Sequence, residues 1–274
     1  MPTDCTSRTL LARLERYYDA VPRPRSRMEE VGPFTLFVAD AGWPFYARPR
    51  LGETAPATVD DVRRVLARQQ EIGVPRAIEW VDETTPGLLE VVKDAGVQVE
   101  ECPLLVLEGA PTGEAGSARM LDSTEETLLL LSRAAVHVGF GNGGTARGEA
   151  SIAERDSMAA SGPATLDPTM RARLQTGEHR AAAVFAPAEP ELGPVGGGGY
   201  SPVDGTAEIA GVAVLPSFRR QGLAAQVSYV LAADAVERGA TTVFCSAQTA
   251  AVARVYEGVG FRRVGTACIA EVPD

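Results

Sequence analysis

The sequence predicts an α/β (α+β) fold in which helices pack on a mixed sheet and two halves of the chain are related. Short apolar runs of strand length alternate with stretches of helical periodicity along most of the 274 residues. The order helix, glycine, strand, helix, glycine, strand occurs twice, around Gly73 and Gly96 and again around Gly239 and Gly260. This shared order suggests a duplication. With 45% hydrophobic and 23% charged residues, the chain can bury a core.

The first half is expected to cover residues 1–110. Its opening helix carries leucines at helical spacing and is ended by Pro22 and Pro24. The next helix has Thr58 as its cap and Gly73 after its end. The expected helices are residues 9–18, 59–72 and 85–95, and the expected strands are residues 34–39, 43–48, 77–81, 97–101 and 104–108.

The second half is expected to cover residues 118–274, after a linker at 109–117 that is rich in glycine and small residues. No periodicity assigns the glycine-rich segment 139–162 to a helix or a strand. The expected strands are residues 118–121, 180–186, 195–200, 207–214, 242–246 and 263–272, with a flexible or bulged stretch at 196–199. The expected helices are one that Ser123 caps and that carries residues 128–136, and residues 167–174, 222–238 and 249–259.

Composition excludes several classes of function. The formal net charge of -10 argues against a general affinity for nucleic acid or an anionic membrane surface. The four cysteines lie far apart, and His137 and His179 have no partner at ligand spacing, so no metal site is expected. Ser201 and Ser246 have no histidine nearby in the sequence, which gives a serine hydrolase no support. Without a signal core or an apolar run of membrane length, a soluble cytoplasmic protein is expected.

The most informative stretch joins an apolar strand that ends at Val214 to an alanine-rich helix that Gly222 opens. The first amides of such a helix have no partner within the helix and carry a partial positive charge, so they bind a pyrophosphate well. Gly222 and Ala224 leave room for phosphate oxygens to approach the backbone. Arg219 and Arg220 add charged donors at the rim of this site.

Two motifs resemble those of the GNAT acyltransferase superfamily. Arg219-Arg220-Gln221-Gly222-Leu223-Ala224 fits its signature for coenzyme A, Arg/Gln-x-x-Gly-x-Gly/Ala between a strand and a helix. Further on, Tyr256-Glu257-Gly258-Val259-Gly260-Phe261 resembles the tyrosine and Gly-Phe that follow the next strand in this superfamily. The resemblance covers residues 118–272 and implies a mixed, mostly antiparallel sheet flanked by helices.

The resemblance also implies acetyl-CoA as the cosubstrate and assigns residues to it. The backbone of Val212, Ala213 and Val214 would pair with the pantetheine amides, and an N–H near Val214 would polarise the thioester carbonyl. The family often has asparagine at the start of the last helix, where Thr249 stands here. The amides that would hold the pyrophosphate are those of Arg220, Gln221, Gly222, Leu223, Ala224 and Ala225.

Two side chains are candidates for proton transfer. Tyr256 would protonate the departing thiolate, because a phenol can supply a proton at neutral pH. Glu208 would accept a proton from the incoming ammonium, as a glutamate in an Ala-Glu-Ile context does in some superfamily members. The structural alternatives are a half-buried helix aromatic for Tyr256 and a solvated strand glutamate for Glu208.

The first half lacks the coenzyme A signature. Two aspartates, Asp60 and Asp61, stand at the start of its helix and would repel a pyrophosphate. This half is therefore expected to be a degenerate GNAT-like unit that shapes the acceptor pocket or stabilises the catalytic half. Its aromatic group at 43–46 would line a substrate pocket or pack in a core.

The resulting hypothesis is an N-acetyltransferase that moves an acetyl group to a primary amine, in a small molecule or a peptide, by direct attack. No cysteine lies in the motif region as a covalent relay. The alternatives are a coenzyme A sensor or scaffold without catalysis, and an interaction domain that uses neither motif. The sequence specifies neither the acceptor, nor the acyl chain length, nor the oligomeric state.

Overall fold

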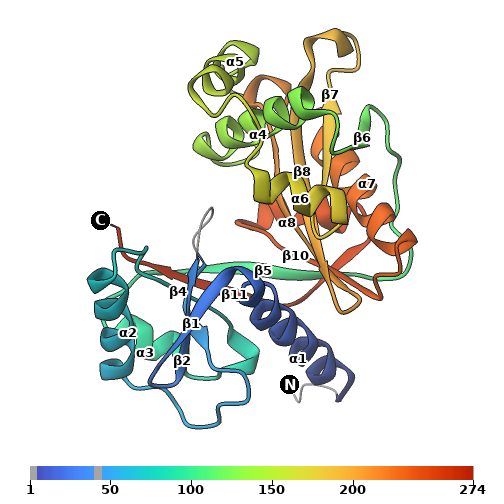
Figure 1. The fold of residues 1–274 in the computed structure, drawn as a ribbon. Coiled ribbons are helices and arrows are strands. Elements are labelled where there is room, and N and C mark those ends of the chain that lie inside the picture. The colour runs from blue at the N-terminus through green and yellow to red at the C-terminus, as the bar shows by residue number, and fades with distance from the viewer. Residues whose placement is uncertain (1–4, 40–44, 274) are drawn as a thin grey trace. The chain divides into compact units, whose positions relative to one another are not determined.

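The computed structural model describes residues 5–39 and 45–273 and divides into two compact units (Figure 1). Unit 1 comprises Met1–Leu104 with Val264–Asp274, and unit 2 comprises Leu105–Arg263. The last strand of the chain thus contributes to unit 1, which differs from the division at 110–118 expected from the sequence. Within the described residues, no helix is long and apolar enough to cross a membrane.

Unit 1 contains a small antiparallel sheet and part of a larger one. The small sheet has the order β1-β2-β3, and in the larger sheet the order is β4-β11-β5. The strands are β1 Ser26–Val31, β2 Phe34–Ala39, β3 Arg48–Pro49, β4 Ala77–Val81, β5 Val99–Leu107 and β11 Phe261–Glu271, and the helices are α1 Cys5–Ala20, α2 Val59–Glu71 and α3 Leu88–Asp94.

Three elements of unit 1 differ from the sequence prediction. The strand β1 is absent from that prediction, and the two strands expected at 97–101 and 104–108 are the single strand β5. The strand expected at 43–48 begins outside the described residues, and β3 itself is only two residues long. The core of this unit packs apolar residues of α2 against its strands, with Phe34, Ile78 and Trp80 among the fully buried side chains.

Unit 2 has the strand order β10-β9-β8-β7-β6. Its neighbouring strands are antiparallel, apart from the parallel pair of β9 and β10. The strands are β6 Ala118–Leu121, β7 Arg180–Phe185, β8 Pro194–Val203, β9 Thr206–Val214 and β10 Thr242–Ser246, and the helices are α4 Glu126–Gly141, α5 Ile152–Ser161, α6 Pro168–Thr176, α7 Leu223–Glu237 and α8 Ala250–Glu257. This is the mixed, mostly antiparallel sheet flanked by helices that the sequence predicts.

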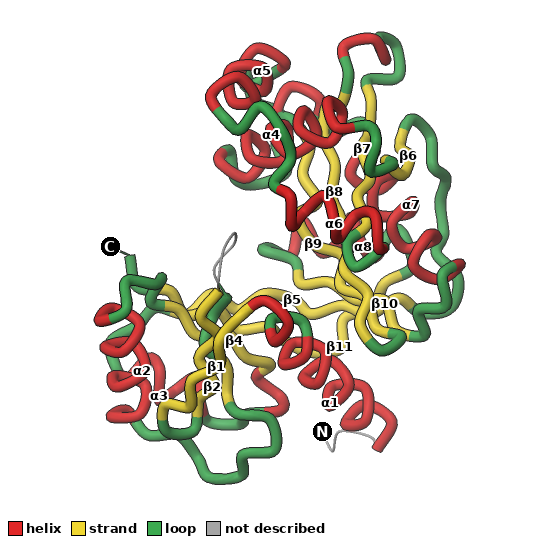
Figure 2. Tube along the Cα trace, in the orientation of Figure 1, coloured by secondary structure: helices red, strands yellow, loops and turns green. Residues whose placement is uncertain are grey.

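The glycines of β8 allow helices to approach the sheet closely from both sides (Figure 2). A Cβ on Gly197 would fall on Ser132 of α4, and a Cβ on Gly198 would lie 3.2 Å from Leu231 of α7. Because successive residues of a strand point to opposite faces, α4 and α7 cover opposite faces of β8. The run 196–199 is therefore a strand, as expected, and its register with β9 shifts between Gly197 and Gly199.

The segment without a sequence assignment, 139–162, begins as the last turn of α4 and ends as α5. The glycines at 139 and 141 are therefore helical and only those after them form a loop.

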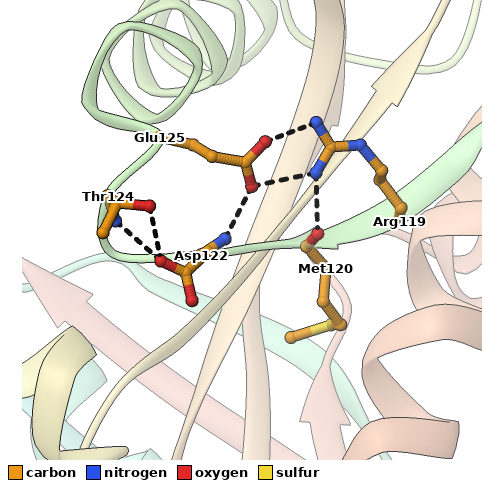
Figure 3. Close-up of polar contacts among 5 residues, drawn as sticks. All are labelled: Arg119, Met120, Asp122, Thr124 and Glu125. Carbon is orange, nitrogen blue, oxygen red and sulfur yellow. Dashed lines mark hydrogen bonds and ion pairs between the residues drawn. The ribbon is translucent and has the colours of Figure 1, made fainter.

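The start of α4 also differs from the prediction that Ser123 caps it. Asp122 accepts hydrogen bonds from Thr124, and Glu125 accepts from Asp122 and from the guanidinium of Arg119, at 2.6 and 2.9 Å (Figure 3).

Candidate functional site

The strands β9 and β10 pair over a short distance and then part. Their parallel register joins Thr206 to Thr242, and it ends where Glu208 lies beside Phe244. The strand β9 continues to Val214 without a further partner on β10. The backbone of β9 between Glu208 and Val214 therefore presents an edge on which an extended, amide-containing ligand can pair.

A β-bulge shapes this free part of β9. Gly197 pairs with Ala213 and Gly199 with Ala210, so β9 has one residue more than β8 between these pairs. Gly211 lies in the extra stretch and has a φ of 66°, a conformation that glycine adopts at little cost. A bulge bends its strand, and this one lies where β9 no longer has β10 beside it.

The start of α7 is open. Gly222 is its N-cap, with a φ of 77°, and no side chain caps the helix. Within the described residues, none of the amides from Arg220 to Ala225 donates a hydrogen bond to the protein. A Cβ built on Gly222 would meet no atom within 4 Å, so the described protein leaves open space beside this residue. Unpartnered amides at a helix start suit a diphosphate, and the binding of a pyrophosphate by these residues stays a prediction.

The two signature arginines have different surroundings, which corrects the expectation that both stand at the rim. Arg219 is half-buried, and its guanidinium donates to five backbone carbonyls, two of them at 2.6 and 2.8 Å. Arg220 is exposed and has a positive φ of 65°. The side chain of Arg219 is thus engaged with the loop after α4, whereas the side chain of Arg220 has no ion-pair or hydrogen-bond partner among the described residues.

Tyr256 lies on α8 with its side chain buried at 5% exposure, so the half-buried alternative does not describe it. Its ring makes an edge contact with that of Phe261 at 5.7 Å between centroids. Burial raises the pKa of the Tyr256 phenol well above its ordinary value, and the nearby Cys245 and Glu208 raise it further. The phenol hydroxyl of Tyr256 makes no hydrogen bond to any side chain or backbone group in the described ranges, whereas its carbonyl accepts from the amide of Val259 at 2.9 Å. The phenol therefore holds its proton throughout the neutral range.

Glu208 is half-buried at the last position of β9 that pairs with β10, and it lies across from Ser201 of β8. Residues paired in this way have side chains on the same face of a sheet. Glu208 and Tyr256 are close enough for the carboxylate to affect the pKa of the phenol. The candidate base therefore lies where β9 and β10 part, near enough to the candidate acid for an electrostatic effect.

A polar cluster of His179, Ser201 and Arg173 lies beside Glu208 and was not predicted from the sequence. Nδ1 of His179 lies 3.1 Å from Oγ of Ser201, and Arg173 donates to the same oxygen at 3.0 Å. This corrects the expectation that Ser201 has no histidine nearby. The two residues are 22 positions apart in sequence, and only the pairing of β7 with β8 brings them together.

Two further residues complete the description of the site. Thr249 is the N-cap of α8, and its hydroxyl accepts from the amide of Val252 at 3.2 Å. Cys245 is fully buried, and burial raises the pKa of its thiol well above the usual range, so it is a poor nucleophile. Among the described residues, no group of three histidine, cysteine, aspartate or glutamate side chains is placed to hold a metal ion.

Comparisons with known proteins place this geometry in a family. The model of the acetyltransferase (GNAT) family matches residues 152–261. A GCN5-related N-acetyltransferase from Kribbella flavida is 23% identical, with 97% of this chain and 96% of that chain covered and a TM-score of 0.67. A GCN5-related N-acetyltransferase-like protein from Streptococcus suis is 14% identical, with 96% and 98% covered and a TM-score of 0.53.

A GNAT-family acetyltransferase from Colwellia psychrerythraea is 13% identical, with 97% of each chain covered and a TM-score of 0.52. At these identities the solved structures show a shared fold. No curated protein matches the sequence. The family model covers β9, the open start of α7 and the tyrosine of α8, which are the parts that carry the two sequence motifs. Residues 152–261, within the second unit, therefore match the GNAT acetyltransferase family, and the solved structures share their fold with nearly the whole chain.

Proposed function

We propose that unit 2 is an N-acetyltransferase that moves an acetyl group from acetyl-CoA to a primary amine. The observation that carries this proposal is the open start of α7, whose first amides have no partner in the described protein, at the end of a strand with a free edge. A helix start of this kind holds a diphosphate, and a free strand edge holds an arm that contains amides. Coenzyme A has both parts in that order.

The residues that would hold acetyl-CoA are those of the β9–α7 connection. The amides from Arg220 to Ala225 would bind the diphosphate, with the exposed guanidinium of Arg220 beside them. The backbone of Val212, Ala213 and Val214 would pair with the pantetheine arm. Thr249 has its hydroxyl in a helix cap, so its contact with the arm would come from its other atoms.

The reaction needs few protein groups. When bound, acetyl-CoA supplies an acyl group activated as a thioester. A backbone N–H near Val214 would donate to the thioester carbonyl. Glu208 would accept a proton from the acceptor ammonium, and Tyr256 would give the proton of its phenol to the departing thiolate. The raised pKa of Tyr256 keeps that proton available at neutral pH.

We further propose that unit 1 is a GNAT-like unit without a cosubstrate site. The start of its helix α2 is closed by a capping box of Thr58 and Asp61, and this acidic start would repel a diphosphate. The unit would therefore shape the acceptor pocket or stabilise the catalytic half.

The proposed activity is tested by titrating the protein with acetyl-CoA and by following thiol release in the presence of a panel of primary amines. We expect binding, and thiol release that depends on at least one amine. Binding without release on any amine would favour a coenzyme A sensor or scaffold. Failure to bind any coenzyme A species would contradict the proposal and favour an interaction domain.

A further inference from the structure

The glycine-rich segment 139–150, which consists of the last turn of α4 and the loop after it, lies along the turn that precedes α7. The amide of Gly148 donates to the carbonyl of Pro216 at 3.2 Å, and the amide of Ser217 donates to the carbonyl of Ala150 at 3.1 Å. Arg147 adds a bond from Nη2 to the carbonyl of Ser217 at 3.0 Å. Backbone hydrogen bonds in both directions therefore attach the segment to the turn.

Arg219 lies at the centre of this attachment. A guanidinium has five N–H donors, and Arg219 directs five hydrogen bonds to backbone carbonyls. Nη2 donates to Asn142 at 2.6 Å and to Gly139 at 2.8 Å, and Nη1 donates to Ala146 at 3.3 Å and to Gly143 at 3.5 Å. Nε donates to Val214 at 3.3 Å. The segment thus wraps around one side chain, which also holds the end of β9.

Small residues make the close approach possible. A Cβ on Gly139 would lie 2.9 Å from Cβ of Ala213, and a Cβ on Gly148 would lie 3.0 Å from Cβ of Pro216. The distance at Gly139 is shorter than non-bonded carbon atoms tolerate, and the distance at Gly148 would require Pro216 to shift. Glycine at these positions lets the segment contact the end of β9 and the turn directly.

We infer that Arg219 is a positioning residue that fastens the segment 139–150 to the turn carrying the proposed diphosphate site. The part of this inference that concerns the ligand rests on the proposed function, whereas the attachment itself does not. Because the same turn presents the amides of α7, an ordered segment and an ordered ligand site support each other. By thermodynamic reciprocity, acetyl-CoA then orders the segment, and loss of the attachment weakens acetyl-CoA binding.

Lysine cannot replace Arg219 in this role. The planar guanidinium of arginine has five donors in a fixed arrangement. The ammonium of lysine has three donors on a flexible stem and cannot donate to five carbonyls. The side chain at Arg219 therefore has a geometric role that its charge alone does not fill. Its neighbour Arg220 is exposed and belongs to the proposed ligand site, so the two arginines can be tested against each other.

The test is hydrogen exchange of the protein without ligand, followed by mass spectrometry on peptides that cover 139–150. We compare the wild type with Arg219→Gln, Arg219→Lys and Arg220→Gln. Since several hydrogen bonds hold the segment, exchange should be about tenfold faster or more in both Arg219 variants. In Arg220→Gln it should match the wild type. Acetyl-CoA affinity should fall in all three variants, so that exchange alone separates the two roles.

Unchanged exchange in Arg219→Gln would overturn the inference. Peptides of α7 serve as the control for folding, since their exchange should stay slow in every variant. If Arg219→Gln does not fold, Gly148→Val reads the same attachment with Arg219 intact, and its segment should also exchange faster. If the wild type binds no acetyl-CoA, the proposed function fails, yet the exchange without ligand still decides whether Arg219 holds the segment.

Discussion

The starts of α2 in unit 1 and α7 in unit 2 differ in what occupies their first amides. In α2, the amide of Asp61 donates to Oγ1 of Thr58 at 3.2 Å, and the carboxylate of Asp61 accepts from the amide of Thr58 at 3.0 Å. In α7, no side chain caps the helix and Gly222 leaves the amides open. Two helices that each lead into a strand of the larger sheet thus begin differently: the start of α2 is closed by its own side chains, and the start of α7 is open.

The parallel strand pairs next to these helices also differ in what lies beyond their last paired residues. In unit 1, Ala47 makes a parallel bridge to Ile78, and directly beyond it Arg48 donates to Glu79 at 2.7 Å. Arg48 is 5% exposed, and its guanidinium also lies 4.0 Å from the ring of Tyr18. In unit 2, nothing pairs β9 with β10 beyond Glu208. Unit 1 has a buried ion pair beyond its last parallel contact, where unit 2 has a free edge.

A third difference concerns the candidate acid. Four residues before Gly260 stands Tyr256, whereas four residues before Gly96 stands Val92, which is fully buried. The repeat inferred from the glycines thus keeps an apolar position in unit 1 where unit 2 has a phenol. The comparison teaches that the same order of elements can occur in two units while only one of them has an open helix start, a free strand edge and a buried phenol.

The largest effect is expected from closing the start of α7 with Gly222→Val. A β-branched residue at a positive φ is strained, and its side chain would stand between the amides and a phosphate. Losing two charge-assisted hydrogen bonds should lower acetyl-CoA affinity about a thousandfold, as measured by calorimetry. The matched control is Gly73→Val in unit 1.

Gly73 has a φ of 71° and, like Gly222, no atom within 4 Å of a built Cβ. Its valine variant should therefore lose stability from the same strain and keep the affinity of the wild type. Wild-type affinity in Gly222→Val would remove the main support for the diphosphate site.

The next largest effect is expected from Tyr256→Phe, which gives unit 2 the apolar character that unit 1 has at Val92. If the phenol protonates the thiolate, kcat should fall about a hundredfold while the Kd for acetyl-CoA stays the same. Tyr229→Phe, on α7, is the control and should keep the wild-type kcat.

The pH dependence provides a second readout of Tyr256. A raised pKa means that the phenol stays protonated as the pH rises through 10, the usual tyrosine value. Titration of Tyr256 should therefore not reduce kcat between pH 7 and about pH 10. An alkaline loss of kcat below pH 9 that disappears in Tyr256→Phe would contradict this assignment.

The sequence predicts the part of the fold that carries the motifs well. The expected strand at 207–214 and helix at 222–238 match β9 and α7 closely, because Pro216 and Gly222 mark where one ends and the other begins. Elements held by tertiary contacts were harder to predict. The strand β1 has the polar sequence Ser-Arg-Met-Glu-Glu-Val and forms because β2 pairs with all of it.

The candidate site shows the same limit. Residue types identify Arg219, Glu208 and Tyr256 as candidates, but no spacing rule gives the direction of a side chain. The guanidinium of Arg219 donates to carbonyls of a segment whose sequence has no periodicity. The contact of His179 with Ser201 depends on the register of the strands. Both facts require the fold in three dimensions.

The smallest effect is expected from opening α2 with Thr58→Ala. Loss of an N-cap of this kind costs about 1 kcal/mol, so unit 1 should lose that much stability in urea unfolding at pH 7. The hydroxyl of Thr58, which bonds the carboxylate, is the main cause that lowers the pKa of Asp61. Because the pKa of Asp61 is lower in the folded than in the unfolded protein, its ionised carboxylate stabilises the fold at pH values above its unfolded pKa, near 4. This contribution is lost as the pH falls through the folded pKa.

The stability difference between the wild type and Thr58→Ala should therefore begin to shrink as the pH falls below about 4 and be smallest below the folded pKa of Asp61, where Asp61 is protonated in both the unfolded and the folded state. Acetyl-CoA affinity should not change in Thr58→Ala, because the amides of α7 are untouched. An open α2 should also gain no affinity of its own, since Asp60 and Asp61 remain in its first turn and Arg48 stays paired with Glu79. A second acetyl-CoA site in Thr58→Ala would mean that the cap alone had closed unit 1.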